Sequence, residues 1–163
     1  MGKRWIRVTA IVAVGAAAAV VVAVVGIALG GGGGSSSRED YQATVVSARD
    51  RVDFALARIT KSKTFDELSK RIDEAAEVLD DTAGDVDGAG VTDGFDDEND
   101  KLVRTLHAFS DELAGTAATL RDPSFADALP LIRTLSFKQW IAVNRVLTDL
   151  RKKGIEVEPL ARH

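Results

Sequence analysis

Cysteine is absent from the 163 residues of this chain, and histidine occurs only twice. Without cysteine the chain forms no disulfides and offers no thiol for lipid attachment, so packing alone must hold its fold. No Gly-x-Ser-x-Gly elbow, phosphate-binding loop or Glu-x-x-His pair occurs either. His107 borders an apolar helix face and His163 is the last residue, which predicts a surface position for the first and no catalytic role for either. We therefore expect a protein that is not an enzyme and that holds no organic cofactor.

Basic charge is scarce beyond the start of the chain. The sequence has 21 Lys and Arg residues against 25 Asp and Glu residues. Three of the bases, Lys3, Arg4 and Arg7, precede residue 8, which leaves 18 bases against 25 acids in the remainder. A nucleic-acid-binding protein would show a basic surface, so we expect no nucleic-acid partner.

Charge of either sign is missing from residues 8–37. Within this segment, residues 10–29 are almost all Ala, Val, Ile, Leu and Gly, and as a helix they would extend about 30 Å, the thickness of the hydrocarbon core of a bilayer. No charged residue follows until Arg38, so the positive-inside rule places the N-terminus in the cytoplasm and the remainder outside. The sequence predicts a single-pass plasma-membrane protein whose membrane-anchoring residues at the inner interface are Lys3, Arg4, Trp5 and Arg7.

A cleaved signal peptide is the alternative interpretation of this segment. Its apolar core would run about 7–15 residues and end at a small-residue cleavage site. The core here is longer, and the nearest candidate site is Ala28-Leu29-Gly30. We favour the uncleaved anchor, with secretion after signal cleavage as the alternative.

The order of segments defines four regions. Residues 1–7 are the cytoplasmic N-terminus, 8–29 the transmembrane anchor, 30–37 a Gly/Ser linker and 38–163 an extracytoplasmic helical domain. Eight Gly and Ser residues behave as a flexible coil that reaches about 15 Å on average. The domain would therefore stay near the bilayer while turning freely.

Apolar residues recur at alternating steps of three and four in four segments of the domain, the spacing of amphipathic helices. The four faces are Tyr41, Val45, Ala48, Val52, Ala55 and Ile59; Phe65, Leu68, Ile72, Ala75, Leu79 and Thr82; Leu102, Leu106, Phe109, Leu113, Ala117 and Leu120; and Phe137, Trp140, Ile141, Val143, Val146, Leu147 and Leu150. A short helical turn is expected after Asp122-Pro123, and residues 155–160 are expected to form a packed or frayed tail.

Helix ends are marked by residues that favour them. Ser36 with Glu39 and Thr64 with Glu67 have the spacing of capping boxes. Ser136 is expected to begin the last helix and Gly154 to end it. The predicted fold class is all-α: an up-down four-helix bundle after the anchor, or a three-helix core with the last helix docked on it.

Acidic residues gather between the second and third predicted helices. From residue 72 to residue 100 there are twelve acids and no base. Residues 85–96 can be aligned with the twelve-residue calcium-loop frame, although two ligand positions are weakened or absent. The candidate calcium ligands are Asp85, Asp87, Asp93 and Asp96, and a solvated acidic loop is the simpler interpretation.

The function expected from these features is a non-catalytic interaction or scaffold module of a bacterial cell-envelope complex. Its partners would be the membrane and an envelope protein, or a second copy approached through the small residues Gly15, Ala19 and Ala23 of the anchor. The alternative is an extracytoplasmic domain that senses a ligand or cation and acts through a partner protein.

Overall fold

The structure is a computed structural model, and it describes residues 37–121 and 137–162. Within these residues the chain forms four helices and no strand: α1 (Arg38–Ile59), α2 (Phe65–Gly88), α3 (Asp96–Leu120) and α5 (Lys138–Lys152). The all-α prediction is confirmed for this part of the chain, and the helices form a bundle. The predicted anchor at 8–29 and the predicted turn after Asp122 lie outside the described residues.

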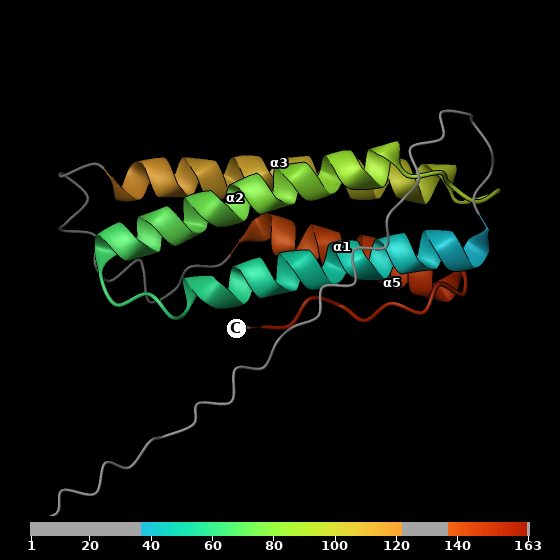
Figure 1. The fold of residues 1–163 in the computed structure, drawn as a ribbon, viewed down its shortest axis with the longest axis horizontal. Coiled ribbons are helices and arrows are strands. Elements are labelled where there is room, and N and C mark those ends of the chain that lie inside the picture. Colours follow the sequence, from blue (N-terminus) through green and yellow to red (C-terminus); the bar gives the residue numbers. More distant parts are fainter. Residues whose placement is uncertain (1–36, 122–136, 163) are drawn as a thin grey trace, which may run out of the picture. The chain divides into compact units, whose positions relative to one another are not determined.

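Consecutive helices pack side by side and alternate in direction (Figure 1). α1 packs on α2, α2 on α3 and α3 on α5, whereas the backbones of α1 and α5 do not approach each other closely. Two buried serines join α2 to α3: Ser69 donates to the carbonyl of Ala117 at 3.0 Å, and Ser110 donates to that of Ala76 at 2.8 Å. Because early residues of α2 meet late residues of α3, these two helices are antiparallel.

The core follows the predicted faces closely. All six residues predicted to face inward from α1 are buried, as are Ile72, Leu79 and Phe109 at the centre of the bundle. The predictions for Phe65 and Ile141 are wrong, because these side chains are 39% and 50% exposed. Phe65 is the first residue of α2, where the helix has not yet met its neighbour.

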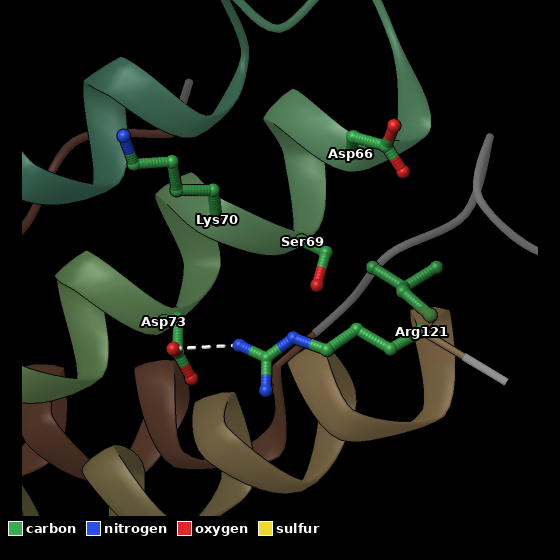
Figure 2. Close-up of a pocket in the computed structure, with 6 residues that line it drawn as sticks. Asp66, Ser69, Lys70, Asp73 and Arg121 are labelled. Carbon is green, nitrogen blue, oxygen red and sulfur yellow. Dashed lines mark ion pairs between the residues drawn. The ribbon is translucent and has the colours of Figure 1, made fainter.

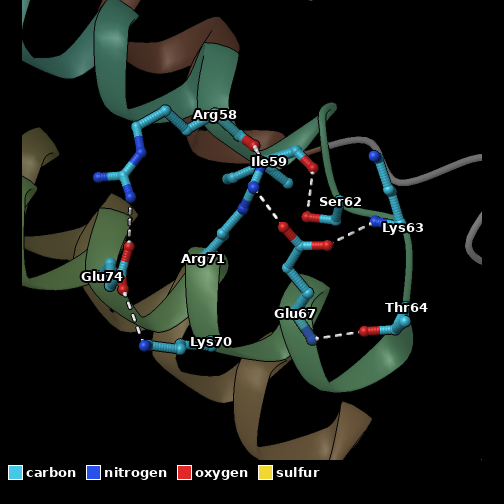
Figure 3. A network of polar contacts seen from close by, with 9 residues as sticks. All are labelled: Arg58, Ile59, Ser62, Lys63, Thr64, Glu67, Lys70, Arg71 and Glu74. Atoms are coloured by element: carbon cyan, nitrogen blue, oxygen red, sulfur yellow. Dashed lines mark hydrogen bonds and ion pairs between the residues drawn. The ribbon is translucent and has the colours of Figure 1, made fainter.

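A network of polar contacts fixes the connection between α1 and α2 (Figure 3). The Thr64 hydroxyl accepts from the Glu67 amide at 3.1 Å, which confirms the predicted cap, and the Glu67 carboxylate accepts from the Lys63 amide at 2.8 Å. Arg71 pairs with Glu67 and donates to the carbonyl of Arg58 at 2.7 Å. One side chain of α2 therefore holds both the turn and the end of α1.

Helix ends are set partly by local residues. Ser37, not Ser36, caps α1, and its hydroxyl accepts from the Asp40 amide at 3.1 Å. Gly154, with φ at +92°, ends α5 as predicted, because the left-handed backbone conformation favours glycine.

The start of α5 is capped from another helix. Both oxygens of the Glu112 carboxylate, on α3, accept from α5 amides, those of Lys138 and Gln139, at 2.9 Å each. A carboxylate at a helix N-terminus is favourable because the first amides there lack intrahelical acceptors. The predicted cap, Ser136, lies outside the described residues.

The segment that follows α5 is extended and buried. We call residues 155–162 the C-terminal tail; its apolar residues Ile155, Val157 and Leu160 are at most 4% exposed. The packed alternative of the tail prediction is confirmed. The tail runs back along the bundle after α5 ends (Figure 1).

Candidate interaction surfaces

The C-terminal tail is held by side chains of both helices that flank it. From α1, the Gln42 side chain accepts from the Glu156 amide at 2.9 Å and Asp53 accepts from the Ala161 amide at 2.8 Å. From α5, Asn144 accepts from the Leu160 amide at 2.7 Å. Later residues of the tail contact later residues of α1, so the tail runs parallel to α1. The tail therefore bridges α1 and α5, whose backbones do not approach each other closely.

The start of the tail is fastened by a cluster around Phe95. The Lys153 ammonium pairs with Glu98 at 2.6 Å and lies 5.6 Å from the centre of the Phe95 ring. The Arg38 guanidinium lies 5.9 Å from the same ring centre and donates to the Lys153 carbonyl at 2.9 Å. The hydrogen bond from Lys153 lowers the pKa of Glu98, whose side chain is only 10% exposed. This cluster joins the first turn of α1, the first turn of α3 and the end of α5.

Tyr41 lies beside this cluster with its ring 5.6 Å from that of Phe95. Burial, with smaller contributions from the charges of Glu98 and Asp96, raises the pKa of Tyr41 to about 12. The phenol is therefore protonated at neutral pH. The Tyr41 hydroxyl and the side-chain oxygen of Asn99 are buried. Neither has a hydrogen-bond partner within the described residues.

Negative charge dominates the edge formed by α2 and α3. α2 carries nine acids and two bases, and α3 carries six acids and two bases. Two ion pairs offset part of this charge: Arg51 with Asp85, and Arg104 with Asp100 at 3.9 Å. The Nδ1 atom of His107 lies 2.8 Å from the Asp80 carboxylate. We call five exposed carboxylates between residues 81 and 97, which make no ion pair within the described residues, the acidic edge: Asp81, Asp87, Asp93, Asp96 and Asp97.

The candidate calcium ligands do not share one loop. Asp85 and Asp87 belong to the last turn of α2, Asp93 lies in the connection, and Asp96 is the first residue of α3. α2 includes the first four residues, 85–88, of the predicted calcium loop. Asp85 and Asp87 therefore have a helical backbone and not the loop conformation that calcium binding would need. Across residues 37–121 and 137–162, no three Asp, Glu or His side chains are grouped as a metal site would require. The calcium hypothesis thus gains no geometric support from the described residues.

A shallow hollow lies where the end of α3 meets the start of α2 (Figure 2). Arg121 reaches across it to Asp73, at 2.6 Å, and Asp66, Ser69 and Lys70 complete its polar lining. Two acids face two bases there, so the hollow has no net preference for an ion of either sign. Its ion pair fastens the end of α3 to α2.

Positive charge is concentrated on α5. This helix carries four bases and one acid. Its exposed residues Lys138 and Arg145 make no ion pair within the described part of the chain, while Lys152 pairs with Asp149 at 2.9 Å. Beyond the end of α5, Lys153 pairs with Glu98 of α3 at 2.6 Å.

The predicted membrane-anchoring residues Lys3, Arg4, Trp5 and Arg7 lie outside the described residues. Among those that the structure describes, no helix combines the length and apolar character needed to cross a bilayer. Comparison of the chain with protein-family models, with curated proteins and with solved structures finds no match.

Proposed function

We propose that this chain is a membrane-tethered interaction module, a helical bundle held outside the plasma membrane by residues 8–29. Support for the tether comes from the sequence: thirty uncharged residues follow Lys3, Arg4 and Arg7, and a Gly/Ser segment precedes α1. The bundle acts without catalysis, as a scaffold within an assembly of a bacterial cell envelope.

The observation that carries the interaction role is the acidic edge. Its five carboxylates are exposed in the last two turns of α2, in the connection that follows and at the start of α3, and none makes an ion pair within the described residues. Charge of one sign on one surface steers association and selects partners of opposite charge. A basic surface of an envelope protein is therefore the partner that this edge fits.

Affinity purification of the full chain from detergent-solubilised membranes tests this role. The acidic-edge variant would combine Asp81→Asn, Asp87→Asn and Asp97→Asn. A matched control would neutralise three exposed acids elsewhere, Asp50→Asn, Asp66→Asn and Asp111→Asn.

We expect a protein partner in stoichiometric amount with the natural chain and with the control, and its loss at moderate salt with the acidic-edge variant. A partner retained equally by all three chains would contradict the role of the edge. Recovery of the chain in the soluble fraction without lipid would contradict the tether.

A further inference from the structure

α5 differs in charge from α2, the helix on the other side of α3 in the packing order. α5 carries four bases and one acid, whereas α2 carries nine acids and two bases. α3 lies between these two helices, and α2 and α5 make no close backbone approach to each other. Within the described bundle, α5 is therefore net basic and α2 net acidic.

Three of the four bases of α5 lie on one solvent-facing side of the helix. Lys138, Ile141, Arg145 and Lys152 are exposed and follow one another at steps of three, four and seven, which places these four residues on one face. Asp149 is exposed on the same face and pairs with Lys152 at 2.9 Å. The opposite face of α5, with Val143, Val146, Leu147 and Leu150, is buried. We call Lys138, Ile141, Arg145 and Lys152 the α5 stripe.

We propose that the α5 stripe docks on anionic lipid headgroups of the membrane in which the chain is anchored. The proposal rests on the tether proposed above. Lys138 and Arg145 supply cations that no described carboxylate neutralises, and Ile141, which is 50% exposed between them, supplies an apolar contact with the interface. Lysine, arginine and an apolar side chain on one helix face are the features by which helices bind anionic bilayer surfaces.

The separation in sequence between the proposed anchor and α1 is short enough for this face to reach the lipid. The Arg38 guanidinium donates to the Lys153 carbonyl at 2.9 Å, so the first residue of α1 lies beside the end of α5. Eight residues separate Leu29 from Arg38, and fully extended they span no more than about 30 Å. That length lets the bundle lie down on the bilayer as well as stand away from it.

The net negative charge of the domain does not prevent this contact. The Debye length is about 8–10 Å at moderate salt, and one helix with its side chains is about 10 Å across. Charges on α2 are therefore largely screened from a surface that touches α5. Each cation near an anionic surface favours binding by about a factor of five, so Lys138 and Arg145 together favour the docked orientation by about twenty-five-fold.

Single-cysteine labelling tests the proposal cleanly because the chain has no cysteine of its own. The full chain would carry Ile141→Cys on the α5 stripe or, as a control, Phe54→Cys on α1, where the natural side chain is 66% exposed. Each would be labelled with a polarity-sensitive fluorophore and reconstituted into phosphatidylcholine vesicles with or without phosphatidylglycerol. Flotation after a high-salt wash shows separately whether the chain stays with the vesicles, and so whether residues 8–29 anchor it in the bilayer.

We expect a blue shift of the probe at 141 only in vesicles that contain phosphatidylglycerol, its reversal by salt or by Lys138→Gln with Arg145→Gln, and no shift at 54. If the chain floats but the probe at 141 does not respond to phosphatidylglycerol, the docking proposal is overturned while the tether stands. If the chain does not float, both are overturned. A shift that follows the protein-to-lipid ratio and ignores lipid charge would assign the stripe to a second copy and overturn docking on lipid.

Discussion

Two glycines of the bundle differ in what a side chain would meet. Gly154 has φ at +92°, and a Cβ there would collide with the Arg38 guanidinium. Gly84 lies inside α2, and a Cβ there would have no atom within 4 Å outside its own helix backbone. The first glycine is required by the structure and the second is not.

Alanine at these two positions should therefore have opposite effects. We expect Gly154→Ala to lower the free energy of unfolding by about 1–3 kcal/mol, from backbone strain and displacement of Arg38. Gly84→Ala should raise it by about 0.5–1 kcal/mol, because alanine loses less conformational freedom in a helix than glycine does. Urea unfolding of the full chain in detergent, followed by far-UV circular dichroism, measures both. Equal destabilisation by the two substitutions would contradict the conclusion that the structure requires glycine at position 154 but not at position 84.

The ion pair between Glu98 and Lys153 makes stability depend on pH. The hydrogen bond from Lys153 lowers the pKa of Glu98 in the folded state below the unfolded value of about 4.3. The folded state then releases the proton more readily than the unfolded state, so this pair stabilises the fold above pH 4.3. The stabilisation is lost as pH falls through the folded pKa.

Glu98→Gln should lower the free energy of unfolding at pH 7 and should reduce its decline on acidification. The measurement is the urea midpoint of the natural chain and the variant, at pH 7 and at pH 3. Glu77→Gln, at an exposed position of α2 that makes no ion pair within the described residues, is the matched control. A difference between Glu98→Gln and the natural chain that stays the same at both pH values would contradict this role.

At the scale of elements, the C-terminal tail acts as a fifth packing element. Its buried residues fill the space between α1 and α5, and side chains of both helices accept hydrogen bonds from its amides. Ile155 is fully buried in the tail, whereas Ile141 is 50% exposed on α5. Alanine substitution at both positions therefore separates the effect of lost packing from the effect of removing an isoleucine side chain as such.

Ile155→Ala should lower the free energy of unfolding by about 2–4 kcal/mol, because it removes buried methyl groups and leaves a cavity. Ile141→Ala should change it by no more than about 0.5 kcal/mol, as expected for an exposed site. Thermal unfolding of the full chain in detergent compares the two. If both variants unfold at the natural temperature, the tail does not belong to the core.

Element positions could be predicted from the sequence where the determining contacts are local. Apolar spacing identified the buried face of α1, and Thr64 and Gly154 marked helix ends because caps and left-handed residues act within one turn. The partner of the α5 N-terminus could not be predicted, because Glu112 lies 26 residues before Lys138.

The interaction surfaces were harder to predict from the sequence, because they depend on which helices become neighbours in the fold. The alternation of apolar and polar residues after Gly154 was the only local signal of the tail, and it does not say what the tail packs against. Asp85 and Asp87 appeared to begin a loop, but α2 extends to Gly88 and its last turn includes both. Pairing of Asp85 with Arg51 of α1 offsets one charge at this helix end, a contact between positions 34 residues apart.

At the scale of the whole molecule, charge is distributed unevenly along α2 and between α2 and its neighbours. The first turn of α2 holds Asp66 and Glu67, where negative charge is favourable, and its last turn holds Asp85 and Asp87 with no base. Asp93 of the acidic edge follows in the connection, and Asp96 and Asp97 follow at the start of α3. The C-terminal end of α2 therefore combines an unfavourable helix dipole with like-charged neighbours.

A lysine should thus have opposite effects at the two ends of this helix. We expect Asp87→Lys to raise the free energy of unfolding by about 0.5 kcal/mol or more at low salt, because it reverses a charge that both the dipole and the acidic edge disfavour. Asp66→Lys changes the net charge by the same amount but should lower stability, because it places a cation at the N-terminal end. Both effects should shrink in 1 M salt, where the Debye length falls to about 3 Å. Equal shifts from the two substitutions would mean that net charge, rather than its position in the bundle, determines stability.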